Sequence, residues 1–441
     1  MAIKVGMVSL GCPKNQMDAE LMLARLQAAG MELVAESGLA EVVIVNTCGF
    51  IEDAKREAIE NILEFAQLKK EGQIRRIIVT GCLAERYQQE LARELPECDA
   101  VLGLGANGDI VQAVRDVMDG KKAVSFPPKS NWCLDGDRLL TTPPFFAYLR
   151  IADGCDNRCT YCAIPSIRGP FRSRKMETLV QEARQLVQGG VKELTLIAQD
   201  TTLYGTDLYG KPMLPELLEQ LCAIEGLEWI RLLYCYPEHI TDELLAVMAR
   251  EPKIAKYMDI PLQHAAEKVL RAMNRKGSAQ SLAQLIAHIR ATVPDITLRT
   301  TVMVGFPGET DDDFEQLCAF LKKAKFEKLG CFVFSPEEGT AAEKLPDRVS
   351  GRVASHRQEL VMDLQSRISQ RHLQKQVGRE VRVMAESYDR YAGCWFGRSE
   401  ADAADIDGKV FFQSDKPLRA GDFVTVRITD CMDYDLMGVV I

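Results

Sequence analysis

Residues 154–162 read Gly-Cys-Asp-Asn-Arg-Cys-Thr-Tyr-Cys and place Cys155, Cys159 and Cys162 in a CxxxCxxC spacing after a strand-like apolar run. A short loop with three thiolates can surround one 4Fe–4S cluster and leave its fourth iron without a protein ligand. Such an open position can accept a substrate or cofactor directly, as in catalytic zinc sites. The simpler alternatives are incidental buried cysteines and a structural zinc site, which normally needs a fourth Cys or His nearby. The spacing therefore predicts a cluster with an open iron.

The region around this loop predicts a domain of repeated strand and helix units over residues 145–375. Its strand-like runs are Phe146–Ile151, Leu194–Gln199, Trp229–Tyr234, Met258–Leu262, Thr297–Val304 and Gly330–Phe334. Helical patterns separate these runs, and a polar helical stretch, Val353–Gln376, follows the last one. Six such units in about 190 residues fit an incomplete parallel (β/α)6 barrel better than a closed eight-stranded one.

The N-terminal part, residues 1–125, repeats one pattern three times: an apolar run, a turn with a cysteine, and an amphipathic helical pattern. The apolar runs are Ile3–Ser9, Val42–Asn46 and Arg76–Thr80, and the turns carry Cys12, Cys48 and Cys82. Alternating strands and helices predict a parallel α/β domain, in which the carboxyl ends of the strands meet at one edge. The three cysteines should therefore be neighbours. They fit a second cluster with its own open iron, although Cys is also a common small buried residue.

The remaining segments complete the predicted domain order. Residues 126–144 contain Pro, Asp and Ser without clear periodicity and are interpreted as a linker. Residues 376–441 predict a small antiparallel β-barrel from five short runs, Glu380–Ala385, Gly393–Arg398, Lys409–Phe412, Asp422–Ile428 and Leu436–Val440.

Composition narrows the class of protein. The chain of 441 residues is 47% hydrophobic, which is sufficient for several buried cores. It shows no export signal and no run of about 18 apolar residues, so we expect a cytoplasmic protein with no membrane partner. In that setting its 14 cysteines are expected to be reduced thiols for metal binding or catalysis. The net charge of −9 gives no global attraction to nucleic acid.

The CxxxCxxC loop at the head of a barrel-like domain resembles the radical S-adenosylmethionine superfamily. In that superfamily the methionine moiety of the cofactor chelates the open iron, and one electron splits the sulfonium to give a 5′-deoxyadenosyl radical. The resemblance implies cofactor contacts from Tyr161, before the last cysteine, and from Gly305, in the run Val-Gly-Phe-Pro-Gly-Glu. It also suggests Arg299, Gln199 and Gln263, each of which is equally well explained as a structural residue at the rim of the barrel.

The order of a three-cysteine α/β domain, a radical barrel and a small β-barrel resembles the methylthiotransferase family over essentially the whole chain. That family replaces a C–H bond with C–S–CH3. The resemblance implies two 4Fe–4S clusters and S-adenosylmethionine as cofactors, with one molecule of the latter supplying methyl and another the radical. A reductant protein is the expected electron source. The alternative from another class is a non-catalytic iron–sulfur electron-transfer or cluster-carrier protein, which would not need the Gly305 motif.

Four motifs resemble the branch of the family that modifies the β-carbon of an aspartate in small-subunit ribosomal protein twelve. They are Ser9–Asn15, Asn46–Ile51, Ala163–Gly169 and Gly397–Ser399. The branch that modifies tRNA adenosines typically has Gln-Met-Asn after its first cysteine, whereas this chain has Pro-Lys-Asn. A tRNA adenosine methylthiotransferase is kept as the alternative.

Charge gives a separate argument about the substrate. Residues 376–441 contain eight basic and twelve acidic residues, a net charge of −4. An acidic module suits a basic ribosomal protein and disfavours tRNA, because RNA affinity depends largely on cationic contacts. A plain acidic surface is the simpler explanation. The aromatic side chains that could stack on bases are expected to form the core of the small barrel instead: Trp395, Phe396, Phe411 and Phe412.

A second glycine motif, residues 103–108, fits GxGxxG. No acidic residue follows at the expected distance after a further clear strand, so we interpret this motif as a tight turn and not as a dinucleotide site.

Overall fold

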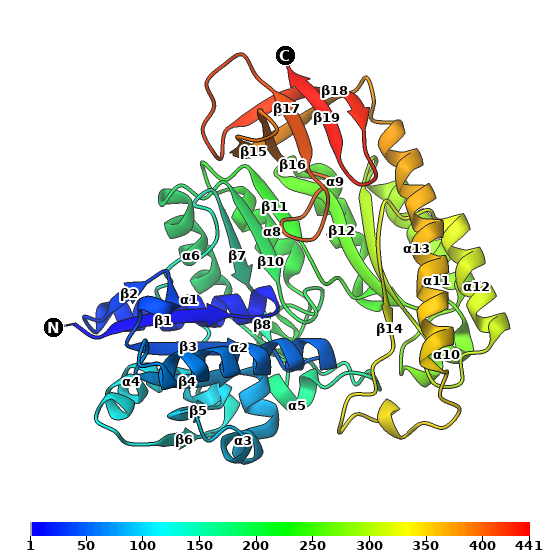
Figure 1. The fold of residues 1–441 in the computed structure, drawn as a ribbon. Coiled ribbons are helices and arrows are strands. Elements are labelled where there is room, and N and C mark those ends of the chain that lie inside the picture. Colours follow the sequence, from blue (N-terminus) through cyan, green and yellow to red (C-terminus); the bar gives the residue numbers. More distant parts are fainter. Residues whose placement is uncertain (1) are drawn as a thin grey trace. The chain divides into compact units, whose positions relative to one another are not determined.

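The computed structural model describes residues 2–441, and the chain divides into two compact units (Figure 1). The first, called the N-terminal unit, comprises the residues up to 142 together with residues 152–174 and 335–343. The second, called the barrel unit, comprises residues 143–151, 175–334 and 344–441. Among the described residues, no helix is both long enough and apolar enough to cross a membrane.

A six-stranded parallel sheet lies at the centre of the N-terminal unit, in the order β2-β1-β3-β4-β5-β6. Its strands are β1 (Lys4–Ser9), β2 (Glu32–Val34), β3 (Val42–Thr47), β4 (Arg76–Gly81), β5 (Ala100–Leu102) and β6 (Ala123–Ser125). The parallel sheet and its three long strands, β1, β3 and β4, are confirmed. The sequence did not predict β2, β5 and β6, because three residues are too few to show a period-two pattern.

Helices cover both faces of this sheet. They are α1 (Pro13–Ala28), α2 (Glu52–Lys70), α3 (Cys82–Glu94) and α4 (Ile110–Met118). Val42 and Ile44 of β3 are buried in one core with α1 and α4, whereas Val43 and Val45 are buried in another with α2 and α3. Both faces of β3 are therefore apolar, as expected for a strand inside a doubly covered parallel sheet.

The predicted linker contributes to the N-terminal core. Apart from a 3-10 turn at Lys129–Asn131, residues 126–142 have no helix or strand, but Trp132 and Leu134 are buried in the core that holds α1 and α4. Trp132 Nε1 donates a hydrogen bond to Asp18 Oδ1 at 2.9 Å. The turn-rich composition predicted the irregular backbone of this segment. The burial of Trp132 and Leu134 could not be predicted, because isolated apolar residues form no periodic pattern.

The glycines of residues 103–108 have a packing role. A Cβ at Gly105 would meet the carbonyls of Pro127 and Pro128, and one at Gly103 would meet Glu85 Oε2 at 2.5 Å. Close backbone packing thus explains these glycines.

The barrel unit contains the second six-stranded sheet, in the order β14-β13-β12-β11-β10-β7, with every pairing parallel. Its strands are β7 (Phe146–Arg150), β10 (Glu193–Ile197), β11 (Trp229–Leu232), β12 (Ile254–Gln263), β13 (Thr297–Val304) and β14 (Lys328–Val333). Strands β7 and β14 form its two ends and do not pair with each other within the described chain. The incomplete barrel predicted from the six runs is confirmed.

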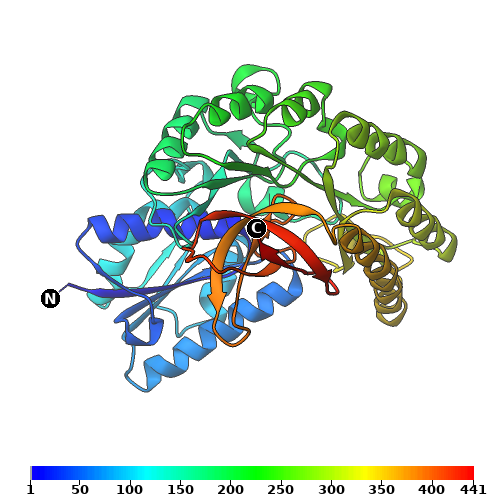
Figure 2. The same cartoon turned by 90° about the horizontal axis from the view of Figure 1, so that it is seen from above.

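Helices follow the strands of this sheet along one arc, as the green to yellow ribbons of Figure 2 show. They are α6 (Met176–Gln188), α7 (Thr206–Tyr209), α8 (Leu214–Cys222), α9 (Asp242–Arg250), α10 (Glu267–Ala272), α11 (Ala279–Thr292), α12 (Asp311–Ala324) and α13 (Gly351–Gln374). The long α13 corresponds to the polar helical stretch that the sequence predicts at the end of this domain.

The C-terminal segment forms a closed five-stranded barrel in the order β15-β16-β17-β19-β18. Its strands are β15 (Glu380–Asp389), β16 (Cys394–Ser399), β17 (Val410–Gln413), β18 (Phe423–Cys431) and β19 (Leu436–Val440). All five predicted strands are confirmed, although β17 and β19 pair in parallel and the other pairings are antiparallel. Phe412 is buried in its core and Trp395 packs against that core, whereas Phe396 and Phe411 pair with each other and stay half-buried.

The small C-terminal barrel, β15 to β19, contacts the amino-terminal ends of strands in the six-stranded sheet of the barrel unit. Arg398 binds Glu193, the first residue of β10, at 2.8 Å, and Asp402 binds Lys328, the first residue of β14, at 2.8 Å. Within the barrel unit, the small barrel and the carboxyl ends of the strands therefore lie at opposite ends of the sheet.

Candidate cluster and cofactor sites

The three cysteines predicted as neighbours in the N-terminal α/β domain lie at the carboxyl ends of neighbouring strands. Cys12 precedes α1, Cys48 follows β3, and Cys82 is the first residue of α3. A Cβ on Gly11 would lie 2.9 Å from Cys48 Sγ, so the backbone beside Cys12 approaches Cys48 closely. The structure thus brings together the residues that the repeated strand–turn–helix pattern predicted as neighbours.

The side chain of Asn15 connects the turns that carry these cysteines. Its Nδ2 donates to the carbonyls of Leu10 (2.7 Å), Asn46 (3.2 Å) and Thr47 (3.2 Å), which belong to the Cys12 and Cys48 turns. Its Oδ1 faces Cys82 Sγ at 4.0 Å. Asn15 is buried, so one amide holds all three turns in register.

Asn46 reinforces this arrangement from the neighbouring strand. Its Nδ2 donates to the Asn15 carbonyl at 2.7 Å and to Ser9 Oγ at 3.1 Å. Asn15 and Asn46 both occur in motifs that the sequence singled out, but no pattern indicated that each side-chain amide would donate to the main-chain carbonyl of the other residue.

Two thiols at this edge, those of Cys48 and Cys82, have raised pKa values. Burial, against the opposing effect of Arg168 and with smaller contributions from Cys12 and Cys48, raises the pKa of Cys82 to about 12. Burial also raises the pKa of Cys48. Without bound metal the thiols of Cys48 and Cys82 are therefore protonated near neutral pH, and a metal that binds them must displace protons.

Three neighbouring thiols fit an iron–sulfur cluster better than a single metal ion. Within residues 2–441, no three His, Cys, Asp or Glu side chains are arranged to hold one metal ion. A cluster has several irons, so its thiolates need not converge on one point. The donor set, its shared edge and the close packing at Gly11 are consistent with the predicted cluster, and the ligand role of these cysteines stays a prediction.

The CxxxCxxC loop belongs to the N-terminal unit. It lies between β8 (Ala152–Asp153) and β9 (Arg172–Ser173), which pair with each other, and α5 (Ile164–Arg168) follows its last cysteine. Backbone hydrogen bonds fold the loop tightly: Cys155 N donates to Gly169 O at 3.1 Å, and Cys162 N donates to Cys159 O at 3.1 Å. The structure therefore places both predicted cysteine sets in one compact unit.

Residues 335–343 belong to the N-terminal unit although they lie late in the sequence. They form hydrogen bonds with segments close to both sets of cysteines. Glu337 is buried and accepts hydrogen bonds from Arg86 Nη1 (2.9 Å) and from the backbone of Glu52 (3.1 Å), four residues after Cys48. The Ala342 N–H donates to the Thr160 carbonyl, between Cys159 and Cys162, at 2.8 Å. No sequence pattern had assigned this segment a role.

Tyr161 lies half-buried in the CxxxCxxC loop, whereas the other predicted cofactor contacts belong to the barrel unit. Gln199 follows the carboxyl end of β10, and Gln263 is the last residue of β12. Gln263 has a φ of +72°, which is uncommon for a residue with a side chain and is frequent at binding sites. These placements agree with the rim predicted for them, and their contacts with a cofactor stay a prediction.

Gly305 directly follows β13 and has a φ of +76°. A Cβ at this position would collide with the Cβ of Ala354 on α13. The next residues of the motif are also fixed, because Glu309 accepts hydrogen bonds from Phe306 N (3.0 Å) and Arg357 Nη1 (3.0 Å). Close packing against α13 is thus a sufficient reason for glycine at position 305, in addition to the predicted contact with the cofactor.

Arg299 lies near the amino end of β13. Its Nη1 contacts Asp259 Oδ1 at 2.8 Å, and its Nε lies 3.8 Å from Asp407 Oδ1 in the small barrel. Two carboxylates therefore already hold this guanidinium. These contacts favour the structural alternative, and pairing with the cofactor carboxylate stays a prediction.

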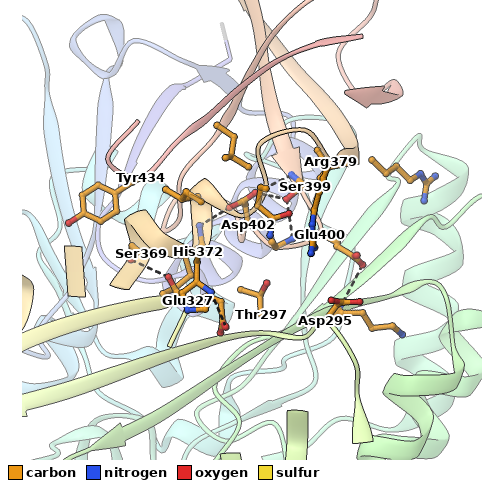
Figure 3. A pocket seen from close by; sticks show the side chains of 18 of the residues that line it. Asp295, Thr297, Glu327, Ser369, His372, Arg379, Ser399, Glu400, Asp402 and Tyr434 are labelled. Atoms are coloured by element: carbon orange, nitrogen blue, oxygen red, sulfur yellow. Dashed lines mark hydrogen bonds and ion pairs between the residues drawn. The ribbon is translucent and has the colours of Figure 1, made fainter. Parts of the chain in front are cut away.

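The cavity drawn in Figure 3 lies at the amino-terminal ends of the strands of the six-stranded sheet in the barrel unit. Gln199, Gln263 and Gly305 lie at the opposite, carboxyl-terminal ends. Its volume is about 370 Å³, and α13, the small barrel and the amino ends of β13 and β14 line it. Its charged groups are of both signs and pair across it, as Asp402 does with Lys328. It contains neither a predicted cysteine nor Gln199, Gln263 or Gly305. A cavity of about 380 Å³ in the N-terminal unit, by contrast, reaches Cys12.

The structure changes the meaning of the negative charge in residues 376–441. Asp402 pairs with Lys328, while Asp405 and Asp407 accept hydrogen bonds from Tyr148 and Tyr257. Part of the acidic excess therefore attaches the small barrel to the six-stranded sheet of the barrel unit. Charge alone is consequently a weaker argument about the substrate than the sequence suggested.

Three family models match consecutive parts of the chain. The Radical SAM superfamily matches residues 149–321, the uncharacterized protein family UPF0004 matches residues 4–103, and the TRAM domain matches residues 377–441. The matched order is the one that the sequence predicted.

Curated relatives match along their whole length. A protein of Pelotomaculum thermopropionicum named ribosomal protein uS12 methylthiotransferase RimO is 51% identical over 441 residues, covering 99% of each chain. Relatives with the same name from Desulforamulus reducens and Thermoanaerobacter are each 48% identical over 98% of this chain.

A solved structure supports the fold. The radical S-adenosylmethionine methyltransferase TsrM from Kitasatospora setae, with cobalamin and a 4Fe–4S cluster bound, aligns over 78% of this chain and 74% of its own. The TM-score is 0.57 and the identity is 12%, so the likeness concerns the fold alone.

Proposed function

The chain belongs to the RimO family of ribosomal protein uS12 methylthiotransferases, and on this basis we propose that it adds a methylthio group to the β-carbon of an aspartate in that ribosomal protein. The full-length identity of about half carries this proposal. Membership also disfavours a non-catalytic electron carrier. A reductant protein is the proposed second partner.

Membership of the radical superfamily implies a 4Fe–4S cluster and S-adenosylmethionine. We assign the first cluster to Cys155, Cys159 and Cys162 and a second, auxiliary cluster to Cys12, Cys48 and Cys82. When bound, the first cluster supplies the electron that cleaves S-adenosylmethionine, and the second holds the sulfur to be transferred.

The protein's own residues would position these groups. The amide of Asn15 fixes the turns of the second cysteine set. The bond from Ala342 to Thr160 and the contacts of Glu337 fix the loops that follow Cys48 and Cys159. Gln199, Gln263 and Gly305 at the strand ends, and Tyr161 in the loop, are the proposed contacts for S-adenosylmethionine. Hydrogen abstraction by a radical requires no side-chain base.

The test is an anaerobic assay of the reconstituted full chain with S-adenosylmethionine, reductant and sulfide, offered either protein uS12 or tRNA. We expect one methylthio group on a single aspartate of uS12, located by mass spectrometry of its peptides. The matched control is the chain with Cys155→Ala, which should give neither 5′-deoxyadenosine nor product. A methylthio group on tRNA adenosine and not on uS12 would keep the chemistry and overturn the proposed substrate.

A further inference from the structure

Arg168 lies between the elements that carry the two cysteine sets. It is the last residue of α5, six residues after Cys162, and its side chain is only 1% exposed. One guanidinium nitrogen, Nη2, lies 3.5 Å from Cys82 Sγ and 2.8 Å from Asp18 Oδ2. The other, Nη1, donates to Asp153 Oδ1 at 3.2 Å, two residues before Cys155. All of these residues belong to the N-terminal unit.

The surroundings of Arg168 fix its side chain. Asp18 lies on α1 and is itself held by Trp132 Nε1 at 2.9 Å. Asn15 Oδ1, which faces Cys82, lies 3.4 Å from Arg168 Nη2. A planar guanidinium can make these contacts in several directions at once, whereas a lysine ammonium is a single point charge. The position of Arg168 beside the Cys82 sulfur is therefore set by its neighbours on α1 and β8.

A cation that donates a hydrogen bond to a cluster-ligating sulfur favours the reduced, more negative cluster. Hydrogen bonds to the sulfurs and net charge are among the factors that set iron–sulfur potentials. Asp18 and Asp153 are negative and act in the opposite direction, but each of them contacts the guanidinium of Arg168. We take the group in direct contact with the sulfur to have the larger effect.

We propose that Arg168 raises the reduction potential of the auxiliary cluster by holding its guanidinium against the Cys82 sulfur. This inference rests on the proposed assignment of that cluster to Cys12, Cys48 and Cys82. The buried positive charge also offsets the negative charge that thiolates and bound sulfur bring into the site. Arg168 is thus a tuning residue for the cluster and not a contact for either substrate.

The test uses the full chain with Cys155, Cys159 and Cys162 all replaced by alanine, so that only the auxiliary cluster can form. Its midpoint potential is measured by a redox titration followed by electron paramagnetic resonance. Arg168→Lys should lower the potential, because the ammonium cannot bind Asp18 and Cys82 together. Asp18→Asn should raise the potential, because it removes a negative charge and leaves Arg168 in place. Arg172→Lys, four residues away on β9, is the matched control and should not shift it.

Opposite shifts from the two variants support the inference, since simple loosening of the site would not produce both signs. Unchanged potentials in both variants would overturn it. If Arg168→Lys retains no iron, Arg168→Gln takes its place: a lowered potential supports the inference, and an unchanged or raised potential contradicts it. Absence of iron in the parent triple variant would instead overturn the auxiliary-cluster assignment itself, which iron analysis detects before any titration.

Discussion

Individual polar side chains organise the edge where Cys12, Cys48 and Cys82 meet. The amide of Asn15 and the guanidinium of Arg168 both reach Cys82 from other elements. Both residues occur in motifs that the sequence analysis singled out. The repeated strand–turn–helix pattern predicted that the three cysteines would lie at one edge of the sheet. The roles of Asn15 and Arg168 could not be predicted, because each depends on contacts across more than 30 residues of chain.

Replacing Cys12 should separate the two proposed activities. Cys12→Ala should retain cleavage of S-adenosylmethionine to 5′-deoxyadenosine and lose methylthio transfer, because only the auxiliary cluster loses a ligand. Chromatography of the nucleoside and mass spectrometry of uS12 measure the two products. Cys133→Ala, at an exposed cysteine of the same unit, should change neither. Persistence of both activities in Cys12→Ala would falsify the auxiliary role of this cysteine.

Removing the Asn15 amide should destabilise the N-terminal unit. Asn15→Ala leaves the buried carbonyls of Asn46 and Thr47 without this donor, which we expect to cost about 1–3 kcal/mol. The midpoint of urea unfolding of the metal-free protein measures the effect. Asn61→Ala, which removes one exposed hydrogen bond to Glu57, should cost less than about 0.5 kcal/mol. Equal midpoints for the two variants would contradict the role of Asn15.

At the scale of elements, the sequence predicted long segments well and short ones poorly. Strands β13 and β19 coincide with their predicted ranges, because runs rich in β-branched and apolar residues are visible in the sequence. Strands β5 and β6 have three residues each and lie in a sheet whose neighbours determine them. The contacts of residues 335–343 were also unpredictable, since they join parts of the chain more than 150 residues apart.

The contact between the end of β13 and α13 can be tested at Gly305. Gly305→Ala combines a positive φ with a collision at Ala354, and we expect a loss of about 1–3 kcal/mol. Gly308 provides the control, because its φ is +78° but a Cβ there would meet nothing within 4 Å. Gly308→Ala should therefore report backbone strain alone, with a smaller shift in the thermal midpoint.

A second variant checks the cause of the Gly305 effect. Ala354→Gly removes the Cβ that collides, so adding it to Gly305→Ala should recover part of the lost stability. If Gly305→Ala is no worse than Gly308→Ala, close packing on α13 does not explain this glycine.

At the scale of the molecule, a buried network of ion pairs attaches the small C-terminal barrel to the six-stranded sheet of the barrel unit. Glu193 is fully buried and binds Arg231 at 2.8 Å and Arg398 at 2.8 Å. Burial alone would raise the pKa of Glu193, but the two arginines lower it below its ordinary value of 4.5. The stabilisation is therefore fully present above about pH 4.5 and is lost as the pH falls through the lower folded value.

Neutralising Glu193 should expose this dependence. Glu193→Gln leaves the buried Arg231 without its carboxylate and leaves Arg398 with Glu386 alone, so it should destabilise the barrel unit by about 3–5 kcal/mol at pH 7. Its loss of stability on acidification should be smaller than that of the parent, as measured by thermal unfolding between pH 7 and pH 3. Glu219→Gln, in the exposed pair with Arg250, should leave both quantities nearly unchanged.

The N-terminal unit includes residues 335–343, which are made long after the strands that they contact. A nascent chain therefore cannot complete this unit when Cys82 leaves the ribosome, because Glu337 has not yet been synthesised. At about 5–20 residues per second, the delay is on the order of ten seconds or longer. During translation, the contacts of Glu337 with the segment after Cys48, and of Ala342 with the CxxxCxxC loop, are therefore among the last to form in this unit.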